Sequence, residues 1–142
     1  MLLEIGSPEA AEHWLTDRLA GKGKIMGFGH RVYRYGDSRV PKMKDYRDEL
    51  ARCNGGTKWV EISNILEKSM IEQKNIFPNL DFPAAVTYYL MGFEIELFTP
   101  IFVMARTAGW CAHVLEQLQD NRLVRPLSEY TGAAPRPVPV KG

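Results

Sequence analysis

The spacing of apolar residues along the chain predicts helices separated by segments rich in glycine and proline. Residues 58–73 carry apolar side chains three or four positions apart, which places them on one face of a helix. A second helix is predicted over 8–20. Ser7 and Pro8 are typical of a helix start, and Gly21 is typical of a helix end. Two more helices are predicted: one over 41–52, which is rich in helix-forming residues, and one over 84–91, which a preceding aspartate can cap. The chain is therefore expected to be mostly α.

The longest predicted helix covers residues 100–118 and is apolar nearly all round, with Thr99 and Pro100 as its start. A helix of this kind needs cover on every side, so we expect it to be buried. Arg106 interrupts the apolar surface, and a buried guanidinium without a partner is costly, so we expect it to meet a carboxylate. Residues 121–142 hold four of the nine prolines and show no helical period, which predicts an extended arm.

Residues 23–30 read Gly-Lys-Ile-Met-Gly-Phe-Gly-His, and the three glycines favour a loop whose backbone can approach a ligand closely. The formal net charge of +1 gives no reason to expect a nucleic-acid or membrane partner. Within 22–47, however, eight basic residues stand against two acidic ones. This excess, with Arg34 and Arg39 five residues apart, favours phosphate or carboxylate binding over a merely solvated face.

The composition excludes several other classes of protein. At 142 residues, 45% of them hydrophobic and 25% charged, the chain has the length and make-up of one globular domain. Cys53 and Cys111 lie far apart without a CxxC spacing, so we expect neither zinc nor a disulfide, and a reducing, cytoplasmic location. The sequence shows no signal peptide, membrane span, Walker loop or dinucleotide fingerprint.

Two residues stand out as candidates for acid–base chemistry. His30 follows the glycine-rich loop and opens the basic segment, which suits an imidazole that acts on an anionic substrate. His13 and His113 lie inside predicted helices, where structural roles are expected. Asp81 has apolar neighbours, and burial there would raise its pKa toward that of a useful general base; a plain helix cap is the alternative.

Four stretches of the chain, in order, resemble the C-terminal part of the citrate synthase family. Three short motifs, GHRVYRYGDSRVP, YYLMG and LVRPLSEYTG, are most similar to the 2-methylcitrate synthases, with the citrate synthases proper as close relatives. The four stretches span nearly the whole chain: IMGFGHRVYRYGDSRVP at 25–41, KNIFPNLDFPAA at 74–85, FTPIFVMARTAGWCAHVLEQ at 98–117 and NRLVRPLSEYTG at 121–132.

The resemblance implies an all-α enzyme that condenses oxaloacetate with an acyl-CoA co-substrate, without a metal or a covalently bound cofactor. Residues 1–92 would form the small domain, and 93–142 a returning long C-terminal helix and extended arm that belong to the large domain. The intact enzyme would be a homodimer. The choice between propionyl-CoA and acetyl-CoA stays open.

The resemblance also assigns roles to individual residues. His30 would protonate or hydrogen-bond the oxaloacetate carbonyl, and Asp81 would remove the α-proton of the acyl-CoA. The oxaloacetate carboxylates would be held by Arg39, by Arg106 and, in the neighbouring subunit's site, by Arg125. Coenzyme A would meet the following residues: Arg34 at a phosphate, the backbone of Ile25, Met26, Gly27, Phe28 and Gly29 at the adenine, and Lys74 and Asn79 as further candidates.

One departure from the family pattern concerns a second active-site histidine. The family carries it in a His-Gly-Gly motif, which these 142 residues do not contain. We therefore expect a fragment that is inactive alone and that self-associates through its apolar helix. Two alternatives remain: a free-standing coenzyme A-binding module, and an interaction protein that uses the 100–118 helix.

Overall fold

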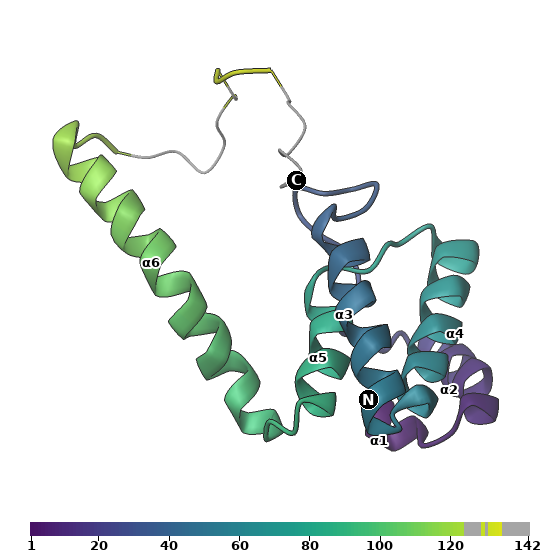
Figure 1. Cartoon of the computed structure of the whole chain (residues 1–142). Helices are drawn as coiled ribbons and strands as arrows, with labels where there is room; N and C mark the ends of the chain where they lie inside the picture. Colours follow the sequence, from purple (N-terminus) through teal and green to yellow (C-terminus); the bar gives the residue numbers. More distant parts are fainter. Residues whose placement is uncertain (124–128, 130, 135–142) are drawn as a thin grey trace. The chain divides into compact units, whose positions relative to one another are not determined.

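The computed structural model describes residues 1–123, 129 and 131–134. The chain divides into two compact units, Met1–Val103 and Met104–Gly142, and each is described by itself. The described residues form helices and no strand, so the predicted mostly-α class is confirmed. Figure 1 follows these elements in chain order: α1 (Leu2–Ile5), α2 (Pro8–Ala20), α3 (Arg39–Asn54), α4 (Thr57–Lys74), α5 (Asp81–Leu90), the 3-10 turn η1 (Ile95–Leu97) and α6 (Phe98–Gln119).

The helix α2 has the bounds that the sequence predicts, although its start is built differently. Pro8 occupies the first helical position, but the Ser7 side chain makes no capping bond to the backbone. A hydrogen bond from the Ser7 side chain instead lowers the pKa of the Glu9 carboxyl, in the first turn, where a negative charge is favourable. Gly21 ends the helix, as predicted.

The helix α3 begins at Arg39, two residues earlier than the predicted start at 41. The reason is Asp37, whose carboxylate accepts the backbone N–H of Arg39 at 3.0 Å and whose carbonyl accepts that of Val40. These bonds satisfy N–H groups that would otherwise be free at a helix start. Pro41 then lies in the first turn, where a missing N–H costs nothing.

The core lies between α2, α4 and the start of α5. Helix α2 packs against α4, and α3 packs against both α5 and α4 (Figure 1). The predicted apolar face of α4 is confirmed, because Ile62, Leu66 and Met70 are all buried. They form one cluster with Ile5, Ala11, Leu15 and Phe82.

A buried cation also joins α3 to α4. The Arg47 side chain is completely buried, and its guanidinium donates to the Ser63 hydroxyl at 2.9 Å and to the Asn64 side-chain oxygen at 3.0 Å. Its Nε donates to the half-exposed Asp48 carboxylate at 2.7 Å. Arg47 therefore belongs to the framework, although it lies in the basic segment that the sequence assigns to an anionic ligand.

The prediction that the long helix is buried is wrong for the described residues. Helix α6 starts at Phe98 after η1, so Thr99 lies inside it rather than capping it, and none of its residues is buried. Arg106 is exposed as well and forms no ion pair with a described residue. The helix leaves several large apolar side chains open, among them Phe102, Met104, Trp110, Val114, Leu115 and Leu118.

Candidate active site

His30 lies exposed at the end of the glycine-rich loop, with one ring nitrogen held by the backbone. Its Nδ1 accepts the N–H of Val32 at 3.0 Å and the N–H of Tyr33 at 3.1 Å. A backbone N–H can only donate, so Nδ1 carries no proton and the neutral ring is protonated at Nε2. The imidazole can therefore donate one hydrogen bond, from Nε2, to an acceptor such as a carbonyl oxygen.

Two glycines give the preceding loop its path. Gly27 and Gly29 have φ angles of 84° and 79°, a region that side chains with a Cβ rarely adopt. At Gly27 a Cβ would also lie 2.8 Å from the Cβ of Phe82, so the loop backbone touches the start of α5. The Phe28 ring packs on the Phe82 ring, with centroids 4.5 Å apart.

Asn79 ties this loop to the helix that carries Asp81. Its backbone N–H donates to the Gly27 carbonyl at 2.9 Å, and its side-chain amide donates to the Gly29 carbonyl at 2.9 Å. Its side-chain oxygen accepts the N–H of Asp81 at 3.0 Å. One residue thus connects the carbonyl next to His30 with the first residue of α5.

Asp81 is exposed, so the burial that would favour a role as general base is not found in this structure. It is also the first residue of α5 rather than its cap, since Leu80 holds the cap position. A negative charge in the first turn of a helix is favoured by the helix dipole. Asp81 lines a mostly apolar cavity of about 320 Å³ together with Met26, Gly27, Phe82 and Ala85.

Asp37 and Arg39 form a paired carboxylate and guanidinium beside this loop. Arg39 donates from Nε to Asp37 Oδ1 at 2.9 Å and from Nη2 to Oδ2 at 2.6 Å, the two-bond geometry that stabilises such pairs most. These bonds lower the pKa of the buried Asp37 carboxyl from 3.8 to about 2, and raise that of Arg39. Sequence reasoning missed Asp37, although an aspartate ahead of a predicted helix start is a recognisable capping signal.

The other predicted site residues lie as follows. Arg34 is exposed in the loop and makes no ion pair with a described residue, and Lys74 is the exposed last residue of α4. Ile25 is partly buried against the core, whereas Met26 is 68% exposed. Arg106 belongs to the second unit, and Arg125 lies outside the described residues. The structure thus brings together His30, Asp81, Arg39, Asn79 and the backbone of 25–29.

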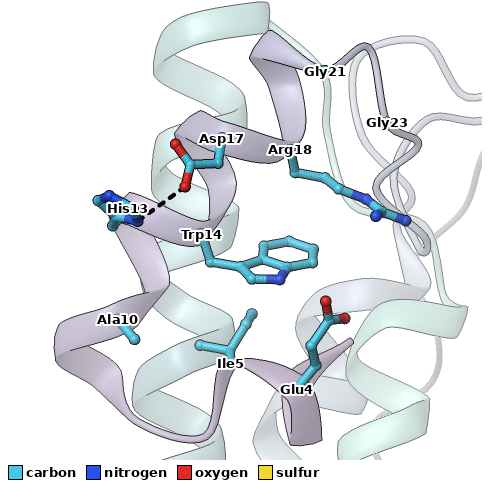
Figure 2. Close-up of a pocket in the computed structure, with 9 residues that line it drawn as sticks. All are labelled: Glu4, Ile5, Ala10, His13, Trp14, Asp17, Arg18, Gly21 and Gly23. Atoms are coloured by element: carbon cyan, nitrogen blue, oxygen red, sulfur yellow. Dashed lines mark ion pairs between the residues drawn. The ribbon is translucent and has the colours of Figure 1, made fainter.

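A second hollow, of about 580 Å³, opens beside α1 and α2 (Figure 2). Three of the polar side chains that line it have partners in the same wall: His13 pairs with Asp17 at 3.1 Å, and the Arg18 guanidinium lies 5.8 Å from the Trp14 ring centroid. Its lining includes neither His30 nor Asp81. The described residues contain no group of three or more potential metal ligands. None of the described helices has the length and apolarity needed to cross a membrane.

Comparison with known proteins identifies the family. The chain is 54% identical over 135 residues to the citrate synthase of Mycolicibacterium smegmatis, and 52% identical over 138 residues to the 2-methylcitrate synthase of Mycobacterium tuberculosis H37Rv. These matches cover 95% and 97% of this chain but only 36% and 35% of those relatives, so the chain spans about a third of their length.

The fold comparison agrees. The structure resembles citrate synthase from Thermoplasma acidophilum, solved as a ternary complex with carboxymethyl coenzyme A and oxaloacetate, with a TM-score of 0.80 and 35% identity. That match covers 98% of this chain and 39% of the other. Residues 1–127 match the family described as citrate synthase, C-terminal domain. The chain therefore belongs to the citrate synthase family, within the C-terminal domain.

Proposed function

We propose that these residues form the coenzyme A-side part of an enzyme that condenses oxaloacetate with an acyl-CoA. The observation that carries the proposal is the link through Asn79, which joins the loop ending at His30 to the helix start that bears Asp81. A condensation needs a base and a polarising donor on neighbouring segments. The Thermoplasma relative, which was solved with a coenzyme A derivative and oxaloacetate, supports the choice of ligands.

The chemistry proceeds in three steps. The Asp81 carboxylate removes a proton from the carbon next to the thioester carbonyl, and the resulting enolate carbon attacks the ketone carbon of oxaloacetate. His30 donates from Nε2 to the ketone oxygen, which becomes the hydroxyl of the product. Water then cleaves the thioester and releases coenzyme A. In the family the donor to the thioester oxygen is the histidine of a His-Gly-Gly motif, which these 142 residues do not contain.

The substrates are polyanions, and the basic side chains provide their binding partners. Arg39 would hold one oxaloacetate carboxylate through Nη1, because Asp37 is bonded only by Nε and Nη2. Arg106 would share the two carboxylates with Arg39, and Arg125 would hold a carboxylate in the partner subunit's site. Arg34 would meet a coenzyme A phosphate, the backbone of 25–29 would bind the adenine, and Lys74 and Asn79 would contribute further contacts. The Asn79 amide already bonds Gly29, so its contact would use a remaining N–H.

Within the family we propose 2-methylcitrate synthase, with propionyl-CoA as the acyl donor, on the GHRVYRYGDSRVP, YYLMG and LVRPLSEYTG motifs. Citrate synthase with acetyl-CoA is the alternative. The two substrates differ by one methylene, which an apolar pocket distinguishes by only about 1–3 kcal/mol. The apolar cavity beside Asp81 can accept that methylene.

A chimaera tests this proposal. The chain replaces the matching C-terminal third of the M. smegmatis citrate synthase, with which it shares 54% identity, and coenzyme A release is measured with oxaloacetate and either acyl-CoA. We expect turnover, with kcat/KM higher for propionyl-CoA. A folded chimaera that binds coenzyme A but does not condense would support a binding module instead. A preference for acetyl-CoA would select the alternative synthase.

Alone, the 142 residues should be inactive and should self-associate. Helix α6 leaves several large apolar side chains exposed, and we expect a second copy of the chain to cover them. Sedimentation should therefore give a mass above 16.1 kDa at high micromolar concentration. Coenzyme A release by the isolated chain would contradict the first expectation, and a monomer the second.

A further inference from the structure

Tyr33 contacts two residues of the candidate site through two different groups. Its backbone N–H donates to His30 Nδ1 at 3.1 Å, and its ring stacks on the imidazole with centroids 4.6 Å apart and planes at 27°. The Arg39 guanidinium lies over the same ring, 5.6 Å from its centroid. One tyrosine thus touches both the donor and the cation to which the proposed function assigns oxaloacetate.

Packing in the core does not account for this arrangement. Tyr33 is 44% exposed and does not belong to the core cluster. Tyr35, two residues further along the same loop, is 89% exposed and stacks on no ring among the described residues. A half-exposed aromatic side chain gives up rotamer freedom when it is held in one place. The ring contacts of Tyr33 are therefore a local arrangement of the site rather than a part of the core.

We propose that Tyr33 is a positioning residue that fixes the His30 imidazole and the Arg39 guanidinium relative to each other. This inference rests on the proposed function through the roles of those two residues. The backbone N–H and the ring of Tyr33 hold the imidazole at Nδ1 and on one face, which leaves Nε2–H as the donor. Asp37 holds Arg39 through Nε and Nη2, while the Tyr33 ring lies beneath the guanidinium.

Such an arrangement reduces the cost of binding. A ligand that carries a ketone oxygen and a carboxylate must otherwise immobilise two side chains with several rotamers each. When both donors are already oriented, that cost falls on the folded protein and not on the complex. The ring contacts together correspond to an affinity gain of roughly 5- to 50-fold.

Nuclear magnetic resonance of the ligand-free 142-residue chain tests the positioning directly. In the wild type, the ¹⁵N shifts of His30 should report one tautomer, protonated at Nε2. Tyr33→Phe should keep this signature, since it retains the ring and the backbone N–H. Tyr33→Leu keeps the backbone N–H but removes the stacked ring, so the imidazole should turn away from its backbone donors for part of the time. The His30 shifts should then move toward the tautomer mixture of an exposed imidazole, while the signals of His13 and His113 stay in place.

Tyr35→Leu is the matched control, because it makes the same chemical change in the same loop and should leave His30 unaltered. The urea midpoint should be unchanged in all three variants, since neither tyrosine belongs to the core cluster. Wild-type His30 signals in Tyr33→Leu, or loss of the signature in Tyr33→Phe, would overturn the proposal. A large drop in the urea midpoint of Tyr33→Leu would show a structural role and would overturn it as well.

Titration with oxaloacetate separates this inference from the proposed function. If the wild type binds oxaloacetate, Tyr33→Leu should bind it roughly 5- to 50-fold more weakly, and Tyr33→Phe should bind it with nearly the wild-type affinity. Equal affinity in Tyr33→Leu and the wild type would overturn the positioning role. If the wild type does not bind oxaloacetate but the His30 signature responds as expected, the ligand assignment fails and the positioning role stands.

Discussion

The helical core and the site loops are held in place by different kinds of interaction. In the core, α2 and α4 meet through completely buried side chains such as Leu15, Ile62 and Leu66. At the site, His30 lies in a loop, whereas Arg39 and Asp81 are the first residues of α3 and α5. All three are exposed, and hydrogen bonds to backbone groups and to Asp37 fix their surroundings. The core therefore depends on removing apolar area from water, and the site on a few directed bonds.

This difference separates stability from function. A core substitution should lower the free energy of unfolding and leave the chemistry of any folded molecule intact. A substitution of an exposed site residue should lower the activity and leave the free energy of unfolding nearly unchanged. The four predictions below test this separation, beginning with the largest expected effect.

Asp81→Asn in the chimaera should lower kcat by roughly 10²- to 10⁴-fold, because an amide cannot accept the proton that the base must take. The side chain is exposed, so the midpoint of thermal unfolding should hardly change. Coenzyme A release and calorimetry measure the two quantities. Asp45→Asn, at an exposed aspartate on α3, is the control and should keep full turnover. Near-normal turnover in Asp81→Asn would mean that another group is the base.

Leu66→Ala should lower the free energy of unfolding by about 2–5 kcal/mol, through lost burial and the cavity that remains. Leu118→Ala makes the same change on α6, where the side chain is 65% exposed, and should cost less than about 0.5 kcal/mol. Urea titration at low protein concentration measures both. Equal costs would show that α6 is covered in solution.

Apolar periodicity predicted the core but could not predict what covers α6. The bounds of α2 and the buried face of α4 follow from local capping and helical spacing, which involve neighbours in sequence. The all-round apolar helix α6 indicates only that cover is needed. Within the described residues none of α6 is buried, so the pattern gives the need for cover and not the surface that meets it.

The candidate site was predictable to a smaller extent. The motifs identified His30, Arg39 and Asp81, but they did not show that Asn79 joins their segments or that Asp37 holds the guanidinium. Those contacts depend on where α5 begins and on a loop that folds back across 50 residues of sequence. Of the two alternatives for Asp81, burial is not found, because its neighbour Phe82 packs into the core while the carboxylate at the helix start stays exposed.

Gly27→Ala tests the contact between the two regions and should cost about 2–3 kcal/mol. It adds a Cβ at positive φ and places it 2.8 Å from the Phe82 Cβ, so α5 or the loop must move. Gly29→Ala is the matched control, with φ of 79° but its nearest atom at 3.7 Å, and should cost about 1 kcal/mol. Urea titration gives the difference, which is the cost of the clash. Equal costs for the two alanines would mean that the loop does not lie against α5 in solution.

The smallest effect concerns acid stability through Asp37. Its pKa in the folded chain is about 2 against an ordinary 3.8, because it is bonded to Arg39, so the folded state favours the ionised carboxylate. This contribution is complete above the unfolded pKa and is lost as the pH falls from about 4 through 2. It amounts to about 1–2 kcal/mol, since the Arg39 side chain is half exposed to screening solvent.

Urea titrations from pH 6 to pH 2.5 should therefore show that Asp37→Asn is less stable than the wild type at pH 6. The difference in free energy of unfolding between the two should become smaller as the pH falls, because the wild type loses the ionised carboxylate that the variant lacks. Asp45→Asn, whose partner Lys42 lies 3.5 Å away at an exposed position, should give a small gap with little dependence on pH. A constant gap for Asp37→Asn would show that the carboxylate acts through its shape as a helix cap and not through its charge.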